Sequence, residues 1–353
     1  MTEPLRFALI GCGRIAYRHA EILHNQIPEA ELAAVCDIAE DKARKYADKY
    51  KVPFYTDYRK MLEKEKIDVV NILTESGNHA KHALNVMDYG KNVVVEKPMA
   101  LKLNDADAMI EKADKKGLKL FVVKQNRYNY PVRKLRAAVE EGRFGKLVLG
   151  TVRVRWCRDQ KYYNEAPWRG TWAMDGGVFT NQASHHIDLL EWMMGEVESV
   201  SAKSATRLVD IETEDTGAAV LKFTNGALGI IEATTATRPK DLEGSISILG
   251  ERGSVEIAGF AVNEMKTWNF AEQRPEDLDV LAEYRQNPPN VYGFGHLEYL
   301  KDVVHSILHN KPAPVDGREG RKSIVLINAL YESIETGQDI KLHFHPERSR
   351  LGQ

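Results

Sequence analysis

The first third of the chain alternates short, continuously apolar runs with longer segments that are apolar on one face only. The apolar runs lie at residues 6–12 (RFALIGC), 30–37 (AELAAVCD), 67–74 (IDVVNILT), 92–98 (NVVVEKP) and 119–125 (KLFVVKQ). The segments between them, such as 39–50 and 78–90, have the spacing of amphipathic helices. Strands that are apolar throughout and are separated by helices are typical of a parallel sheet covered on both faces. We therefore predict an α/β fold that begins with a doubly wound, Rossmann-type domain over residues 1–125.

Beyond residue 125 the pattern changes to strict alternation of apolar and polar positions. KLVLGTVRVRW (146–156) alternates along its length, and residues 215–237 form two alternating runs around Asn225-Gly226, a strong hairpin signal. Residues 244–259 repeat the pattern around a turn that contains glycine. Alternation with tight turns is typical of an antiparallel sheet with one face exposed or packed on a partner. This part of the chain is therefore predicted to hold an open, mainly antiparallel sheet.

Two late segments, residues 296–310 and 320–337, return to helical spacing, and Gly337 ends the second. We predict an α+β domain over residues 126–353 that binds substrate and supports oligomerisation. Its last helices are available to fold back on the first domain.

Composition narrows the classes of partner and compartment. A formal net charge of −2 gives no electrostatic reason to expect nucleic acid or an anionic membrane as partner. The three cysteines Cys12, Cys36 and Cys157 form no CxxC pair, which favours a reducing compartment over a disulfide framework or a zinc knuckle. The sequence has no signal-peptide pattern and no apolar run near the roughly 18 residues that a membrane span needs. We expect a cytoplasmic protein.

The motif GCGRIA (11–16) closes the first predicted strand and opens the first predicted helix. Gly11 allows a tight turn, Gly13 lets the backbone approach a pyrophosphate, and Ala16 permits close packing of helix and strand. Asp37 follows at the end of the second strand, where an acid can bind the adenosine ribose hydroxyls. Because Ile38 comes next, with no basic side chain for a 2′-phosphate, we predict NAD rather than NADP. The alternative is a turn with two glycines and a surface aspartate.

Other nucleotide chemistry lacks its motif here. The sequence contains no GxxxxGK[ST], which disfavours ATP chemistry.

Lys97 of EKP (96–98) ends a predicted strand. Ligands of doubly wound sheets bind at the carboxyl ends of the strands, so Lys97 is predicted to direct its ammonium at the cofactor crevice. The alternative is a solvated lysine at a strand end.

The stretch NQASHHIDLL (181–190) offers a second chemical group. Adjacent histidines point in different directions on a helix, so we predict no metal site here. His186 lies among apolar residues and has the alternative of a buried core histidine. His185 is predicted to take the proton of an alcohol, since a histidine near neutral pKa suits that task. The Lys97 ammonium would stabilise the developing alkoxide and lower the pKa of His185.

GCGRIA, Asp37, EKP and GGVFTNQASHHIDLL together resemble the glucose–fructose oxidoreductase/inositol dehydrogenase (Gfo/Idh/MocA) family, over essentially the whole chain. The resemblance implies a Rossmann domain, a C-terminal open-sheet domain and dehydrogenation of a sugar or cyclitol hydroxyl. It implies that Lys97 and His185 are catalytic, with Asp188 as the acid of the H-x-x-D helix. The family usually has an aspartate four residues before the histidine, where this chain has Asn181. Asn181 can orient a hydroxyl but cannot shuttle a proton, which leaves the role of base to His185 or Lys97.

Several separated blocks resemble one branch of the family, the bacterial dehydrogenases that oxidise the C3 hydroxyl of UDP-N-acetyl-2-amino-2-deoxyglucuronate (UDP-GlcNAcA) for O-antigen sugars of lipopolysaccharide. The blocks are VVKQNR (122–127), GRFG (142–145), YYNEAPWRGTW (162–172), NQASHHIDLL (181–190), LEGSISILGERG (242–253) and VYGFGH (291–296). The family pattern also implies cofactor contacts from Arg14, Ile15, Thr74, Ser76, His79, Glu96, Lys97, Gln125, Trp168 and Arg169.

A block of basic and aromatic residues between 153 and 169 suits a UDP-uronic acid, because guanidinium groups bind diphosphate or carboxylate and aromatic faces bind rings. The alternative is a solvated strand edge with core tryptophans. Besides Lys97, Asn181 and His185, the predicted substrate contacts are Arg155, Arg158 and Tyr163.

Two other functions stay open: dehydrogenation of a free sugar or inositol, and non-catalytic NAD sensing. The exposed sheet face further predicts a homo-oligomer, either a dimer or a tetramer.

Overall fold

The computed structural model describes residues 3–284, 295–343 and 346–353, so most of the stretch 291–296 lies outside the described residues. The chain forms two compact units. The first consists of Met1–Lys124 and His296–Arg321, and the second of Gln125–Gly295 and Lys322–Gln353. The late segment 296–321 therefore belongs to the same unit as the N-terminal third of the chain.

The first unit is built on a parallel sheet of six strands in the order β3-β2-β1-β4-β5-β6. This is the strand order of two mononucleotide-binding halves, which confirms the predicted Rossmann arrangement. The two-residue strand β3 was not predicted, because so short a run shows no period. The strands are β1 (Leu5–Ile10), β2 (Ala30–Cys36), β3 (Phe54–Tyr55), β4 (Val69–Ile72), β5 (Asn92–Val95) and β6 (Leu120–Val122).

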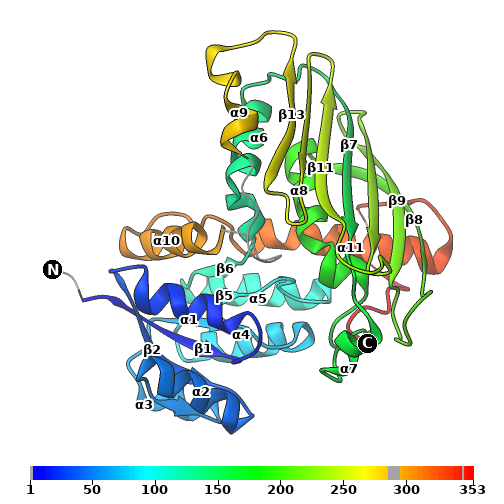
Figure 1. The fold of residues 1–353 in the computed structure, drawn as a ribbon. Helices are drawn as coiled ribbons and strands as arrows, with labels where there is room; N and C mark the ends of the chain where they lie inside the picture. The colour runs from blue at the N-terminus through cyan, green and yellow to red at the C-terminus, as the bar shows by residue number, and fades with distance from the viewer. Residues whose placement is uncertain (1–2, 285–294, 344–345) are drawn as a thin grey trace. The chain divides into compact units, whose positions relative to one another are not determined.

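Helices pack against this sheet, and the chain returns to complete it (Figure 1). At the β6 edge, the Val122 N–H donates to the Val315 carbonyl at 3.0 Å, and a Cβ on Gly320 would meet the Val122 side chain at 2.5 Å. Residues 296–321 thus supply part of the core of the first unit. The helices are α1 (Ala16–Asn25), α2 (Glu40–Tyr50), α3 (Tyr58–Lys64), the 3-10 turn η1 (Ser76–Asn78), α4 (His79–Asp88), α5 (Leu103–Lys116), α10 (Gly295–Leu308) and the start of α11 (Gly317–Thr336).

The second unit is built on an eight-stranded sheet in the order β13-β12-β11-β7-β10-β9-β8-β14. Its neighbouring strands pair antiparallel except for β7 and β10, which pair parallel. Alternation does not distinguish the two, because side chains have period two in either kind of sheet. The strands are β7 (Leu147–Arg155), β8 (Val197–Ala205), β9 (Thr216–Phe223), β10 (Leu228–Thr234), β11 (Glu243–Gly250), β12 (Gly253–Ala258), β13 (Glu264–Phe270) and β14 (Ile340–Lys341).

One face of this sheet is covered by α8 (Ser184–Met194), which lies against β7 and β11 (Figure 1). Gly150 permits the contact, since a Cβ there would meet the side chains of Leu190 and Met194 at 2.7 Å. The remaining helical segments are η2 (Gln125–Tyr128), α6 (Tyr130–Glu140), α7 (Gln160–Asn164), the π-helical turn η3 (Val178–Gln182), η4 (Pro275–Asp277), α9 (Val280–Glu283) and the rest of α11.

The other face of the sheet exposes apolar side chains between charged ones. Val220, Leu228, Ile230 and Leu249 are each more than a third exposed. Cross-strand pairing places Leu228 and Leu249 on either side of Leu149, and Val220 beside Ile230.

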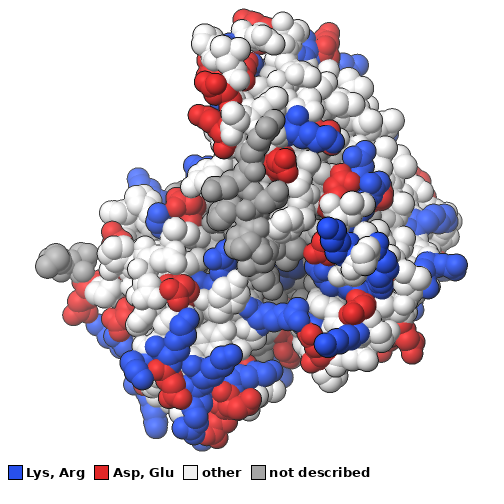
Figure 2. All heavy atoms as spheres, in the orientation of Figure 1, with Lys and Arg blue, Asp and Glu red and all other residues white. Residues whose placement is uncertain are grey.

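The described surface mixes charges of both signs, and its helices are not of the membrane-spanning kind. Acidic and basic side chains are interspersed on the face seen in Figure 2. No helix among the described residues combines the length and the apolar character needed to cross a bilayer.

Candidate functional site

The turn between β1 and α1 has the geometry of an anion site. Gly11 has φ +98°, and a Cβ on it would lie 2.7 Å from the backbone of Leu73, so glycine is required twice over. A Cβ on the exposed Gly13 would meet nothing within 4 Å, so the backbone can be approached from that side. No side chain caps the first turn of α1, and a helix N-terminus attracts anions. These features fit the pyrophosphate of a dinucleotide, with Arg14 exposed and Ile15 half-buried beside it.

Asp37 lies at the end of β2 and braces the same turn. Its Oδ2 accepts the Cys12 N–H at 2.8 Å and its Oδ1 accepts the Ala39 N–H at 2.9 Å. A carboxylate has further lone pairs for ribose hydroxyls. The next side chain, Ile38, is 93% exposed and uncharged, so no cation directly follows Asp37 to meet a 2′-phosphate.

The loop after β4 carries Thr74, Ser76 and His79, at the carboxyl edge of the sheet. His79 is buried, with Nδ1 2.7 Å from the Pro98 carbonyl and Nε2 3.0 Å from the Thr74 carbonyl. Burial lowers the pKa of His79. The ring therefore ties this loop to the segment that follows Lys97, while Thr74 is half-buried and Ser76 is buried.

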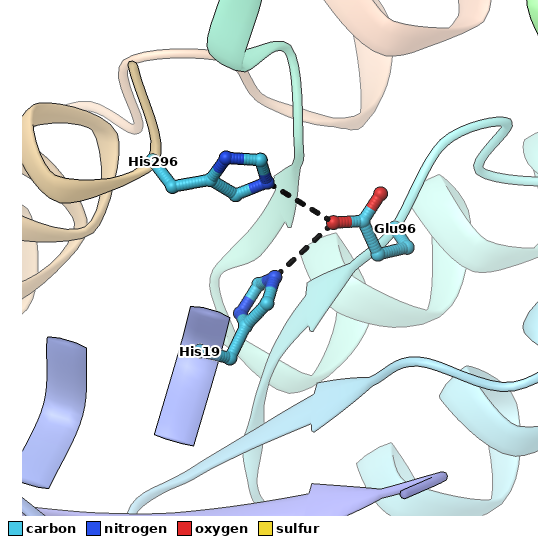
Figure 3. A group of neighbouring side chains, drawn as sticks. All are labelled: His19, Glu96 and His296. Atoms are coloured by element: carbon cyan, nitrogen blue, oxygen red, sulfur yellow. Dashed lines mark hydrogen bonds and ion pairs between the residues drawn. The ribbon is translucent and has the colours of Figure 1, made fainter. Parts of the chain in front are cut away.

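Glu96 and Lys97 follow β5, and the Glu96 carboxylate is enclosed by two histidines that the sequence patterns did not single out (Figure 3). Its Oε1 lies 3.1 Å from His19 Nε2 and 3.7 Å from His296 Nε2, and its Oε2 accepts the Lys97 N–H at 3.1 Å. Burial by itself raises the pKa of Glu96, but the nearby imidazoles of His19 and His296 outweigh it and hold that pKa well below its usual value. Lys97 is half-buried.

In the second unit, His185 lies on the first turn of α8 and contacts Gln125. The Gln125 amide nitrogen and His185 Nε2 are 2.9 Å apart, and both side chains are buried. This bond fixes the orientation of the imidazole. The next residue, His186, is fully buried beside Trp156, and burial lowers the pKa of His186 to about 3, as befits a core histidine.

Asp188 forms a buried, bidentate ion pair with Arg127. Arg127 Nε donates to Asp188 Oδ2 at 2.8 Å and Nη2 donates to Oδ1 at 2.7 Å. Asp188 therefore anchors α8 to the turn that carries Gln125. Arg127 was part of the block VVKQNR but was not predicted as a site residue, because the pairing joins positions 61 residues apart.

Asn181 lies in the π-helical turn η3 and donates from its amide to Asp175 Oδ1. The other oxygen of Asp175 accepts the Gly170 N–H at 2.8 Å. The carboxylate that position 181 lacks is thus present one hydrogen bond away. π-Helical turns are rare and occur frequently at functional sites.

A second buried carboxylate, Glu214, supports this turn from below. Its Oε1 accepts the Phe179 N–H at 3.1 Å and the Tyr331 hydroxyl at 2.9 Å. Tyr331 in turn accepts the Gly177 N–H at 3.1 Å and the Thr180 hydroxyl at 3.0 Å. Burial raises the pKa of Glu214 to about 7. No motif pointed to Glu214 or Tyr331.

Arg155 does not join the predicted site. Residues along β7 alternate between the two faces, and Val152 and Val154 are buried on the face that α8 covers. Arg155 therefore lies on the opposite face, where it binds Glu232 at 2.6 and 2.8 Å and Glu243 at 3.1 Å. In the structure its guanidinium is thus paired with two carboxylates, and contact of Arg155 with the substrate stays a prediction. The sequence showed that alternate residues of β7 face opposite sides of the sheet, but it did not show which side α8 would cover.

Most of the other predicted basic and aromatic residues do gather in one cluster. The Arg158 guanidinium lies 5.3 Å from the Trp156 ring and donates to Asp241 at 2.9 Å. The Arg169 guanidinium lies 4.1 Å from the Tyr162 ring. The half-buried Trp168 packs on Arg169 at 5.6 Å.

A hydrogen bond brings this cluster to η3. Gln182, next to Asn181, donates to the Tyr162 hydroxyl at 3.1 Å. Tyr163 is buried, and its hydroxyl lies 3.1 Å from the Thr235 hydroxyl. Burial raises the pKa of Tyr163 to about 12, so it keeps its proton.

Comparison with known proteins covers nearly the whole chain. Residues 5–124 match the model of the oxidoreductase family, NAD-binding Rossmann fold, and residues 136–342 match that of the oxidoreductase family, C-terminal alpha/beta domain. The chain is 30% identical to myo-inositol 2-dehydrogenase of Thermotoga maritima, over 96% of this chain and 98% of that protein.

Two solved structures are more similar. The WlbA dehydrogenase of Bordetella pertussis, in complex with NADH and UDP-GlcNAcA, is 41% identical with a TM-score of 0.93, over 98% of this chain and 99% of that chain. The WlbA dehydrogenase of Chromobacterium violaceum, also in complex with NADH and UDP-GlcNAcA, is 42% identical with a TM-score of 0.91, over 97% and 96%. The protein therefore belongs to the Gfo/Idh/MocA family of NAD-binding oxidoreductases.

Proposed function

We propose that this enzyme uses NAD to oxidise the C3 hydroxyl of UDP-GlcNAcA to the 3-keto sugar, a step in making bacterial O-antigen sugars. The observation that carries the proposal is the identity of 41–42% to two WlbA dehydrogenases over nearly the full length of both chains. A cytoplasmic location accompanies it, since the chain's three cysteines are free thiols.

His185 takes the proton of the C3 hydroxyl in this proposal, and the Lys97 ammonium stabilises the oxyanion. NAD, when bound, accepts the hydride from C3 at the nicotinamide ring. The carbon loses a hydride and the oxygen a proton, which leaves a ketone. The contact between the Gln125 side-chain amide and His185 Nε2 supports this role because it orients the imidazole.

Asn181 positions the hydroxyl, and Asp175 supports it by fixing the Asn181 amide. The Gly11–Ile15 turn, Asp37, Thr74 and Ser76 are proposed to hold the cofactor, and His79 acts from beneath them. Glu96 is proposed to support the cofactor site by holding the Lys97 backbone.

The sugar nucleotide is proposed to contact Arg158, Arg169 and Trp168. Guanidinium groups backed by aromatic rings suit a diphosphate and a carboxylate. Tyr163 supports this cluster from the interior, and Arg155 is left out of it because it lies on the sheet face opposite the one that α8 covers.

Absorbance at 340 nm tests the substrate. When purified protein and NAD are mixed with UDP-GlcNAcA, NADH should form and the absorbance should rise. Myo-inositol or free N-acetylglucosaminuronate in place of UDP-GlcNAcA should give no such rise. Preference for inositol would favour the second candidate function, an inositol dehydrogenase, which the 30% identity to the Thermotoga maritima enzyme supports.

Two variants test the roles of the catalytic pair. Lys97→Met and His185→Asn should each lower turnover by at least about 100-fold. Both should keep NAD affinity within threefold of wild type, measured by titration calorimetry. Lys91→Met is the matched control and should leave turnover unchanged. Loss of NAD binding in both variants would contradict the assignment.

We also propose that the enzyme is a homo-oligomer in which a second copy covers the open sheet face. The exposed apolar side chains of Val220, Leu228 and Ile230 on that face support this arrangement. Leu228→Glu combined with Ile230→Lys should lower the mass measured by light scattering. An unchanged mass would place any interface elsewhere.

A further inference from the structure

Three elements of the first unit each contribute one side chain to a buried cluster. His19 comes from α1, Glu96 follows β5, and His296 comes from the first turn of α10, and Figure 3 shows both imidazoles directed at the same carboxylate oxygen. Their exposed fractions are 0%, 7% and 2%. A buried site of this kind holds a charge only when hydrogen bonds compensate for the lost hydration.

Hydrogen bonding defines the charge state of the cluster. The Asn71 amide nitrogen lies 2.9 Å from His19 Nδ1. With Asn71 donating, the proton of the neutral ring resides on Nε2, which donates to Glu96 Oε1. Glu96 is then an ionised carboxylate that accepts hydrogen bonds inside the protein.

The ligand atoms of these three residues lie within 4.8 Å of one another, close enough to hold a metal ion. A metal would need the lone pair of His19 Nε2, the position that carries the proton when Asn71 donates. His19 Nε2 is within hydrogen-bond distance of Glu96 Oε1 at 3.1 Å, and His296 Nε2 lies 3.7 Å from the same oxygen. A metal is one outcome of the test below.

The second oxygen of Glu96 connects the cluster to Lys97. Oε2 accepts the Lys97 N–H at 3.1 Å, the Glu96 N–H donates to the Ile72 carbonyl at 3.1 Å, and the Pro98 carbonyl lies 2.7 Å from His79 Nδ1. The backbone on each side of Lys97 is therefore held by a separate hydrogen bond. Such anchoring limits the directions in which the lysine side chain can leave the strand end.

We propose that Glu96 is a positioning residue for Lys97, and that His19 and His296 keep its carboxylate aimed at the Lys97 amide. The inference rests on the proposed catalytic role of Lys97. In this proposal Glu96 affects catalysis by holding the Lys97 backbone in place. The placement of His19 on α1, the helix that begins at the phosphate turn, links that turn to the strand end that carries the ammonium.

Hydrogen exchange in the protein without cofactor tests the contact itself. Glu96→Ala should speed exchange of the Lys97 amide at least tenfold, read by nuclear magnetic resonance. Glu96→Gln, which retains an acceptor oxygen, should change it less. The control Glu111→Gln, at an exposed position of α5, should leave it unchanged. An unaltered exchange rate in Glu96→Ala would overturn the proposal.

Kinetics test the consequence. A misplaced catalytic group lowers turnover steeply, so Glu96→Ala and His296→Ala should reduce kcat by about 10- to 100-fold. KM for NAD should stay within threefold, and activity is normalised to molecules that bind NAD. His19→Gln, whose amide can donate to Glu96, should recover activity that His19→Ala loses. A purely structural role would lower the folded fraction and leave kcat per folded molecule intact, which would overturn the proposal.

Two further results separate the possible failures. If the wild type turns over and Lys97→Met is inactive while Glu96→Ala keeps full kcat, the positioning role fails and the proposed function stands. If Lys97→Met is active, the catalytic assignment fails first. Stoichiometric metal in the purified protein that is lost in His19→Ala would replace the triad by a metal site.

Discussion

Each of the two units buries one glutamate beside its predicted catalytic residue, and the two carboxylates are treated in opposite ways. Glu96 has two histidines against one oxygen and a backbone N–H against the other, and its pKa is held well below the usual value. Glu214 has one backbone N–H and the Tyr331 hydroxyl on Oε1, while none of the residues that the structure describes forms a hydrogen bond with its buried Oε2. Its pKa is raised to about 7.

The difference shows that burial alone does not decide the charge of a carboxylate. Donors on both oxygens, His19 on Oε1 and the Lys97 N–H on Oε2, compensate Glu96 for its lost hydration. Donors on one oxygen only do not compensate Glu214. The first unit therefore favours a charged carboxylate next to Lys97 at neutral pH. The second holds a group whose charge changes near neutral pH, under the turn that carries Asn181.

The largest effect is expected from removing a donor from Glu96. His19→Leu leaves a buried charge poorly paired, which typically costs about 3–5 kcal/mol. Urea unfolding at pH 7 measures the loss. The His19→Gln control should lose clearly less, because it keeps an N–H. Equal losses in the two variants would mean that packing matters here and charge does not.

Glu214 should make the protein less stable as pH rises. Its folded pKa of about 7 lies above the usual 4.5, so the folded state binds the extra proton between these values and stability falls across pH 4.5–7. The full shift corresponds to about 3 kcal/mol. Glu214→Gln should flatten this dependence in urea unfolding at pH 5, 6, 7 and 8. A variant with the same slope as the wild type would contradict the assignment.

The close approach of Gly177 to Glu214 should give a smaller effect. A Cβ at Gly177 would lie 2.0 Å from Glu214 Oε2, so Gly177→Ala should cost about 1–3 kcal/mol through overpacking. Glu214→Ala removes the obstructing carboxylate. In a double-mutant cycle the two substitutions should couple favourably, and additive losses would show that the clash lies elsewhere.

The smallest change in the free energy of unfolding is expected from an ion pair at the surface of the second unit. Glu232 is bound by Arg155 on the open sheet face, where solvent screens the pair once the copies have been dissociated for the measurement. Glu232→Gln should change the free energy of unfolding by less than about 1 kcal/mol. Arg155→Ala should leave KM for the sugar nucleotide unchanged, whereas Arg158→Ala should raise it. A raised KM for Arg155→Ala would restore that residue to the site.

Local spacing allowed much of the fold to be predicted. Continuous apolar runs predicted the parallel strands, and alternation around Asn225-Gly226 predicted the β9–β10 hairpin. The turn at Gly11 and Gly13 was predictable because steric requirements act between neighbouring residues.

Contacts between distant positions were not predictable in the same way. His19, Glu96 and His296 are far apart in the sequence and meet only in the folded chain, and no residue near any of them signals the others. Asp175 is six residues from Asn181, yet their hydrogen bond depends on the π-helical turn. The face on which Arg155 lies depends on where α8 packs, which a single strand does not encode.

The return of residues 296–321 to the first unit has a practical consequence. A truncated gene product ending at residue 124 would leave the Val122 N–H without its acceptor at Val315 and the apolar edge beside Gly320 uncovered. Such a fragment would expose an edge strand that promotes aggregation. Adding a synthetic peptide that spans 296–321 should cover this edge and restore solubility. Transplanting this NAD-binding half into a chimera thus requires two separate pieces of the gene.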